Sequence, residues 1–407
     1  MCSFVTHKTT ANLTGKPLNY GRLTSMSIML PSQIFAQLSL ADVLPSCLAS
    51  LGVTDFPNKL GLAPARSAVV VLVDGLGVHN LRNAQAHARF LAGKLVSSPE
   101  LSTVFPSTTA AALASLTTGA TPGAHGMTGY KTRDPESGNV VNLLTGLGAL
   151  SHPESWLTSP ALYHAAQECN ISTSVVAHPR FADTPLTHLI HSGATQISAK
   201  TLDDRVEAAL SAVSEPGAQL VVLYVSELDE LAHNKGVSSP EWAAALESLD
   251  GALKMLSERL PADVGVIVTA DHGVIDIPAS RHYLYGNDVD HMQHIESVGG
   301  EPRCLQLYFS QESTQQERQN TLTAWRRDWS ELAYVLTREE LVSSGLYGDV
   351  AESNLEKLGD IFVLAKKDVA FYDERDLTLK GRAMIGQHGG ISPTEMAIPG
   401  ILLGAFA

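Results

Sequence analysis

The sequence predicts an α/β fold with a mostly parallel central sheet, helices on both faces, and a smaller α/β insertion. Short runs rich in β-branched residues end in polar or glycine residues, which is typical of buried strands. Helix-like segments alternate with these runs, and the alternation favours parallel strands joined by covering helices. The strand-like runs lie at 67–77, 174–178, 219–229 and 263–273, and the helix-like segments at 79–95, 162–170, 201–215 and 239–260.

The order of segments divides the chain into a core and an insertion. The 407 residues are enough for one large α/β domain with an insertion, or for two domains. We expect the core at 36–279 and 381–407, because the chain returns to small and apolar residues at its end. Residues 280–380 carry more charge and mix strand-like with helix-like segments, so we expect a cap subdomain there. Residues 1–35 are polar without periodicity, which predicts an N-terminal extension that is disordered at least in part.

Composition and charge restrict the partners of the protein. The formal net charge is −14, and 44% of the residues are hydrophobic. Nucleic-acid grooves and anionic membrane surfaces need clustered Lys and Arg, so we expect neither as the main partner. No apolar run reaches 18 residues, so we expect no membrane span. A small anionic substrate would need local positive charge, and a metal ion would supply it.

The cysteines indicate the redox compartment. Cys2, Cys47, Cys169 and Cys304 are scattered and form no C-x-x-C pair. This spacing argues against a disulfide framework and against a thiolate zinc site. The N-terminus also shows no basic segment followed by an apolar one, so we expect no secretory signal and predict a cytoplasmic protein.

Three aspartates stand at the ends of three predicted strands. Asp74, Asp229 and Asp271 follow the runs that begin at 67, 219 and 263. A single aspartate at a strand end is often only a turn former. In open α/β sheets, however, ligands bind at the carboxyl ends of the strands, so three carboxylates there should converge on one site.

Histidines lie close to these aspartates. His233 follows Asp229 by four residues, a spacing that puts both side chains on one face of a helix. His272 adjoins Asp271, and His388 precedes two glycines that let the backbone bend tightly. Taken alone, each is as simply explained by a local hydrogen bond or a turn. Together, six nitrogen and oxygen ligands without a thiolate suit zinc or manganese and are enough for two ions.

Thr108 and Thr109 precede an alanine-rich helix former, AAALASL. One interpretation is an N-cap, because Ser and Thr favour helix starts. The other is a hydroxyl nucleophile at the positive end of the helix dipole, where free N–H groups would meet an anionic phosphoryl group. The local sequence does not choose between them.

The motifs in their order resemble a known family. A strand-end VDG, a Thr that opens a small-residue helix ending in TG, D-x-x-x-H, ADHG and HGG follow one another along the chain. This order resembles the alkaline phosphatase superfamily, and within it the type I phosphodiesterase/nucleotide pyrophosphatase family. The resemblance covers about 67–275 and 383–403, and the ordered set is far more specific than any of its parts.

The resemblance implies a role for each motif residue. The family's nucleophile stands about ten residues before the glycine of the closing TG, which here is Thr109, with Thr108 as the alternative. Thr108 or Ser107 would then cap the helix. Asp229, His233 and His388 would hold one metal, and Asp74, Asp271 and His272 the other.

The segment HGMTGYKTR departs from the family pattern. Where relatives carry an asparagine that contacts a phosphate oxygen, this chain has Tyr130, whose hydroxyl is also a donor. We therefore assign Tyr130 to substrate binding, and Lys131 or Arg133 would add positive charge. His125 is interpreted as structural. The family's nucleophile is usually followed by FPN, whereas alanines follow Thr109.

These implications define the expected activity. The chain is predicted to be a two-metal hydrolase of phosphate esters that forms a phosphothreonine, with Zn²⁺ or Mn²⁺ as the ions. Phosphodiester or nucleotide pyrophosphate bonds are favoured, because no arginine in the core motifs would neutralise a dianionic monoester. The alternatives are a phosphomonoesterase, a sulfate or phosphonate ester hydrolase, a phosphoglycerate mutase-like isomerase, and a non-catalytic metal-binding relative.

Overall fold

The computed structural model describes residues 30–31, 35–378 and 381–407. The predicted N-terminal extension therefore lies almost wholly outside the described residues. Within the described ranges, no helix is long and apolar enough to pass through a lipid bilayer.

A six-stranded sheet forms the centre of the core, in the order β18-β8-β1-β7-β5-β6. All neighbouring pairs are parallel except β18 with β8. The middle strands β1, β7 and β8 are buried at every position except Tyr224, as their β-branched composition predicts. The bounds are β1 Ser67–Val73, β5 Ser172–Ala177, β6 Thr195–Ser198, β7 Gln219–Val225, β8 Val264–Thr269 and β18 Ile401–Gly404.

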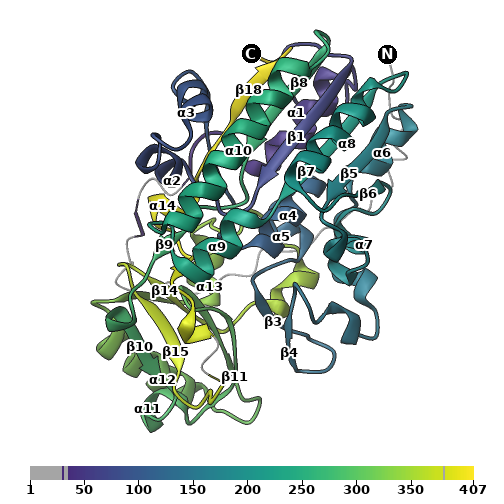
Figure 1. Ribbon diagram of the computed structural model, residues 1–407. Coiled ribbons are helices and arrows are strands. Elements are labelled where there is room, and N and C mark those ends of the chain that lie inside the picture. Colours follow the sequence, from purple (N-terminus) through teal and green to yellow (C-terminus); the bar gives the residue numbers. More distant parts are fainter. Residues whose placement is uncertain (1–29, 32–34, 379–380) are drawn as a thin grey trace.

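Helices cover both faces of this sheet, which confirms the predicted fold class (Figure 1). In the view shown, α8 and α10 lie in front of the sheet, and α1 and α4 lie behind it. The single helix-like segment predicted at 79–95 is corrected by the structure, in which this stretch forms two short helices, α2 and α3. The core helices are α1 Val43–Ser50, α2 Val78–Asn83, α3 Arg89–Leu95, α4 Thr109–Thr118, α5 Pro122–His125, α6 Leu162–Glu168, α7 Pro185–Ile190, α8 Leu202–Ser214, α9 Glu227–Lys235, α10 Pro240–Arg259 and α14 Pro393–Met396.

The insertion has its own sheet and its own apolar cluster. Four antiparallel strands run in the order β11-β12-β14-β13, and α12 packs its tryptophans against them. In Figure 1 this layer lies below the carboxyl ends of the core strands. The bounds are β10 His282–Tyr285, α11 Val289–Met292, β11 Ile295–Glu301, β12 Cys304–Phe309, α12 Gln315–Trp329, β13 Ala333–Thr337, α13 Arg338–Ser343, β14 Ile361–Ala365 and β15 Ala370–Asp373.

A buried ion pair joins the insertion to the core. Arg303, at the start of β12, donates from Nε and Nη2 to the two carboxylate oxygens of Glu395 in α14, each at 2.7 Å. Both side chains are almost completely buried. The remaining short strands are β2 Glu100–Ser102, β3 Lys131–Arg133, β4 Val140–Asn142, β9 Ile275–Asp276, β16 Gly386–Gln387 and β17 Ala397–Pro399.

Candidate active site

The candidate nucleophile Thr109 is the first residue of α4 and faces the predicted metal ligands. Its Oγ1 lies 3.2 Å from Nε2 of His272. Thr108 occupies the N-cap position, but its side chain makes no capping hydrogen bond. Ser107 does not cap the helix either, because its Oγ donates to the Gly390 carbonyl and accepts from the Gly389 amide. The predicted side-chain cap is therefore wrong: these hydroxyls face the HGG loop and the insertion.

Asp74, Asp229 and Asp271 each have one carboxylate oxygen with a polar partner and one oxygen that is buried without a hydrogen bond. Asp271 Oδ1 accepts from the amides of Gly75 and His272, while Oδ2 has no hydrogen-bond partner. Asp229 pairs through Oδ2 with His233, and its Oδ1 is buried without a partner. Asp74 likewise leaves Oδ1 unpartnered. Buried carboxylate oxygens without donors are costly unless a proton or a cation neutralises them, so this arrangement suits a positive charge between them.

The three histidines are all oriented in the same way. In each ring, Nδ1 faces a backbone carbonyl. The distance is 2.7 Å from His233 to Gly386 and 3.3 Å from His272 to Gly273. It is 2.9 Å from His388 to Ser107. If each Nδ1 carries the proton, each Nε2 presents a lone pair to the cluster. Metal-binding histidines show this pattern, in which the second ring nitrogen is held by a carbonyl.

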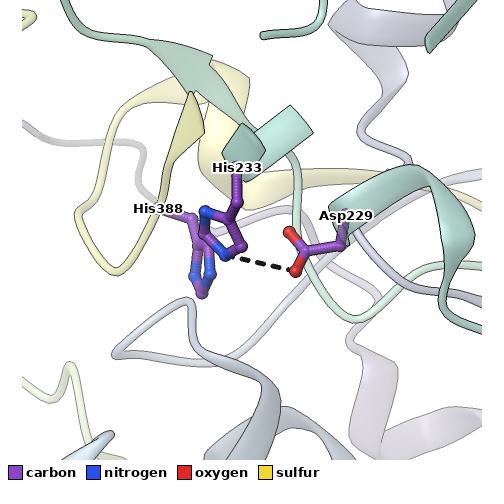
Figure 2. A group of neighbouring side chains, drawn as sticks. All are labelled: Asp229, His233 and His388. Atoms are coloured by element: carbon purple, nitrogen blue, oxygen red, sulfur yellow. Dashed lines mark ion pairs between the residues drawn. The ribbon is translucent and has the colours of Figure 1, made fainter. Parts of the chain in front are cut away.

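The ligand atoms gather into two overlapping groups. Asp229, His233 and His388 form the first, with Asp229 Oδ2 3.2 Å from His233 Nε2 (Figure 2). Asp74, Asp229 and His272 form the second. Asp271, which the resemblance assigns to the second metal, lies beside it, because its Oδ2 is 3.5 Å from His272 Nε2. Asp229 thus stands between the two groups, and all six predicted ligands are brought together.

Burial and neighbouring charges prepare these groups for an ion. Burial lowers the pKa of His272 to about 4 and that of His388 to about 3, so both rings are neutral near pH 7. Burial raises the pKa of Asp271 to about 6, and burial together with Asp271 and Asp229 raises that of Asp74. Neutral imidazoles and clustered carboxylates are what a divalent ion needs, so the residues present fit a metal centre.

Tyr224 is a residue that the sequence reasoning missed. Its hydroxyl donates to Asp74 Oδ2, which leaves Oδ1 facing His272. Because Leu72 pairs with Tyr224 across β1 and β7, alternation places Tyr224 and Asp74 on the same face of the sheet. A hydroxyl inside the otherwise apolar run LVVLYV was the available signal.

Two cavities meet at Thr109 and Asp229. The first, of about 540 Å³, is walled by core residues from β1, β5, β7, α4 and α7, and we name it the core cavity. The second, of about 570 Å³, lies between the core and β11, β15 and the following loop, and we name it the insertion cavity. Both also contact Leu144.

The insertion cavity contains Tyr130, which the sequence analysis assigns to substrate binding, and Lys131, one of the two cations expected to add positive charge. Tyr130 and Lys131 line it beside Thr108 and Thr109. Arg133 does not, because it is held near Glu296 and over the ring of Tyr308. His125 is fully buried, with Nε2 2.8 Å from Ser115 Oγ and Nδ1 accepting from the Met127 amide, which fits a structural role.

Glu301 is a second residue that the sequence reasoning missed. This carboxyl at the end of β11 is buried next to the Thr108 hydroxyl, and burial raises its pKa to about 8. A side chain at Gly389 would collide with Glu301, and Gly389 also has a φ of +108°. Glycine is therefore required at the position after His388.

The central sheet with helices on both faces is the fold of alkaline phosphatase superfamily structures, and the carboxylate and histidine cluster lies at the carboxyl ends of its parallel strands. The model of the type I phosphodiesterase/nucleotide pyrophosphatase family matches residues 68–391. The chain belongs to this family. Membership supports its assignment as a phosphoester hydrolase.

Solved structures share the fold at low sequence identity. Murine ectonucleotide pyrophosphatase/phosphodiesterase 5, an inactive threonine-to-alanine variant bound to AMP, superposes with a TM-score of 0.63 at 16% identity, covering 82% of this chain and 87% of that one. Phosphonoacetate hydrolase from Sinorhizobium meliloti 1021, bound to phosphonoformate, gives 0.64 at 18% identity, covering 84% and 91%.

Proposed function

We propose that the protein is a metal-dependent phosphodiesterase that acts through a covalent phosphothreonine at Thr109. The observation that carries this proposal is the convergence of three unpartnered carboxylate oxygens and the Nε2 atoms of three histidines near one threonine hydroxyl. Asp229, His233 and His388 would hold one divalent ion, and Asp74, Asp271 and His272 the other. Zinc suits this set of nitrogen and oxygen donors, and manganese is the alternative.

The chain's own residues would bring the ester to Thr109. Bound divalent ions would supply the positive charge that lowers the pKa of the threonine hydroxyl and neutralises the phosphate. Thr109 Oγ1 would form a bond to phosphorus while the bond to the leaving alcohol breaks. Water would then cleave the phosphothreonine and restore the hydroxyl. The N-terminus of α4 adds its dipole to the binding of the phosphoryl oxygens.

The charges around the site favour a diester over a monoester. Among the described residues that line the two cavities, the only Lys or Arg side chains are Arg180 and Lys131. Arg180 already donates to Glu230 and Ser226, so it has limited capacity for a second anionic oxygen. A dianionic phosphomonoester would find less compensation here than a monoanionic diester. A related phosphonate or sulfate ester would need the same ions.

The test compares two adjacent threonines in the zinc-loaded enzyme. Hydrolysis of bis-p-nitrophenyl phosphate, p-nitrophenyl phosphate and phosphonoacetate is measured for the wild type, Thr109→Ala and the matched control Thr108→Ala. We expect the diester to be the best substrate and Thr109→Ala to lose at least about a thousandfold in rate, as expected for loss of a nucleophile. Full activity of Thr109→Ala, or activity unchanged by chelation, would overturn the proposal.

A further inference from the structure

The core cavity has a floor made from one face of the central sheet. Strand pairing sets Val175 opposite Val222 and Gln196, and Leu72 opposite Tyr224. Because side chains alternate between faces, these residues and Ala177 all project to the same side. Most of these side chains are small or apolar and do not fill the space above the sheet, so a cavity of about 540 Å³ remains there.

The walls and roof of this cavity are also apolar. Leu113 of α4, Leu186 and Ile190 of α7, Phe181 and Leu144 enclose it. Leu113, Leu186 and Ile190 are almost fully buried. Helix α7 has only six residues, so this part of the sheet is covered by a short helix and loops rather than by a long helix. The apolar enclosure opens onto Thr109, Asp74 and Asp229.

Several polar groups on the cavity wall are engaged by neighbouring residues. Tyr224 donates to Asp74, and Arg180 donates to Glu230 and Ser226. His191 Nδ1 lies 3.0 Å from the hydroxyl of Tyr163. A purine or pyrimidine base needs free donors and acceptors along its edge. With these groups engaged, Gln196 and Thr145 are among the few side chains of the wall left to meet them. An alkyl or aryl group needs only apolar area.

We infer that the core cavity binds the apolar alkyl or aryl ester group of the substrate, and that such esters are preferred over nucleotides. This inference rests on the proposed function for the position of the phosphate at Thr109. The phosphate oxygens stay at the carboxylate and histidine cluster, and the ester carbon enters between α4 and α7. The second substituent of the diester extends into the insertion cavity.

Binding of alkylphosphonates tests this assignment without any turnover. Isothermal titration calorimetry of the zinc-loaded protein with methyl-, propyl- and hexylphosphonate measures the affinity of one head group with growing tails. Each buried methylene contributes about fourfold in affinity, so propyl should bind on the order of tenfold more tightly than methyl. Equal affinities across the series would overturn the inference.

Two cavity-filling variants locate the tail. Ala177→Phe fills the core cavity, and Val298→Phe, the matched control, fills the insertion cavity. We expect Ala177→Phe to abolish the gain from methyl to hexyl and Val298→Phe to retain it. If only Val298→Phe lost the rise in affinity from methyl- to hexylphosphonate, the tail would be bound in the insertion cavity instead. The smaller change Ala177→Val should reduce the rise in affinity with tail length only in part. It replaces Ala177→Phe in the test if that variant does not fold.

Two further measurements separate this inference from the proposed function. Tighter binding of AMP than of hexylphosphonate, lost in Ala177→Phe, would assign the cavity to a nucleoside and overturn the inference alone. If the zinc-loaded protein shows the tail-length gain but hydrolyses no diester, the proposed function fails while the cavity assignment stands.

Discussion

The core cavity and the insertion cavity share the candidate nucleophile but are built in different ways. The core cavity comes from alternating residues on parallel strands and from the helices α4 and α7. The insertion cavity forms only where a second sheet docks, and it is lined by tyrosines and carboxyls such as Tyr130, Tyr372, Glu301 and Asp373. On the proposed function, the reaction centre would belong to the core, whereas recognition of the ester would be divided between two layers.

The largest effect should follow from Asp229→Asn, because Asp229 belongs to both ligand groups and lines both cavities. Loss of its charge should lower kcat/KM by at least about a thousandfold for every ester and reduce the bound zinc. Metal analysis and diester hydrolysis measure both effects. Glu241→Gln, an exposed charge change on α10, is the control and should behave like the wild type.

Removal of Arg303 should weaken the packing of the insertion, which lines the insertion cavity, against the core. Arg303→Met leaves Glu395 charged and buried, so the free energy of unfolding should fall by about 3–5 kcal/mol. Urea denaturation measures this loss. The double variant Arg303→Met/Glu395→Leu removes both charges and should recover much of the stability. A single variant as stable as the wild type would show that the pair does not join the layers.

Tyr224→Phe, a change in the wall of the core cavity, should lower the affinity of the site for zinc. Without the hydroxyl, Asp74 Oδ2 loses its donor and the carboxylate is free to turn. Zinc affinity should fall about tenfold to a hundredfold, the range for partners of metal ligands. Competition with a chromophoric chelator measures it, with Tyr283→Phe on the exposed β10 as control. A change in kcat without a change in zinc affinity would contradict the positioning role.

Zinc affinity should also depend on pH. The pKa of Asp271 is raised to about 6, so a proton occupies this carboxyl below pH 6 and competes with the ion. Affinity should therefore rise with pH, by about tenfold between pH 5 and pH 7 from this group alone. Asp229 raises the pKa of His233, which adds to the trend in the same direction. The chelator competition repeated across this range measures the slope, and a flat profile would contradict it.

The smallest effect should come from Tyr130→Phe in the insertion cavity. Loss of one hydrogen bond to an anionic phosphate oxygen should lower kcat/KM for diesters by about tenfold. The affinity for zinc should stay unchanged, because Tyr130 is not in either ligand group. Steady-state kinetics on a methyl and a bulky aryl diester measure the loss. An unchanged kcat/KM would remove Tyr130 from substrate binding.

Local patterns were enough to predict the sheet and the position of its acidic residues. The β-branched runs form β1, β7 and β8, and Asp74 and Asp271 follow β1 and β8 within two residues. The run predicted at 219–229 is shorter than expected, because β7 ends at Val225 and Asp229 lies in the first turn of α9. Helical spacing placed His233 beside Asp229, which α9 bears out. These features follow from periodicity within a few residues, so they needed no knowledge of distant contacts.

Contacts between distant segments could not be predicted in this way. His388 reaches the cluster through a bond to Ser107, 281 residues away, and Tyr224 bonds Asp74 across 150 residues. The failed side-chain cap at Thr108 has the same cause, because the HGG loop and Glu301 occupy its surroundings. Local propensity favours a cap, and tertiary contacts override it.

The sequence by itself determined the fold class, the strand ends that carry the carboxylates and the family to which the chain belongs. These depend on hydrophobic periodicity and on short motifs whose order is specific. Only the tertiary structure decided which carboxylate oxygens remain free, which nitrogen each histidine presents and what encloses the ester. Those outcomes depend on how sheet, loops and insertion pack, since each buried polar group takes the partner that packing brings to it.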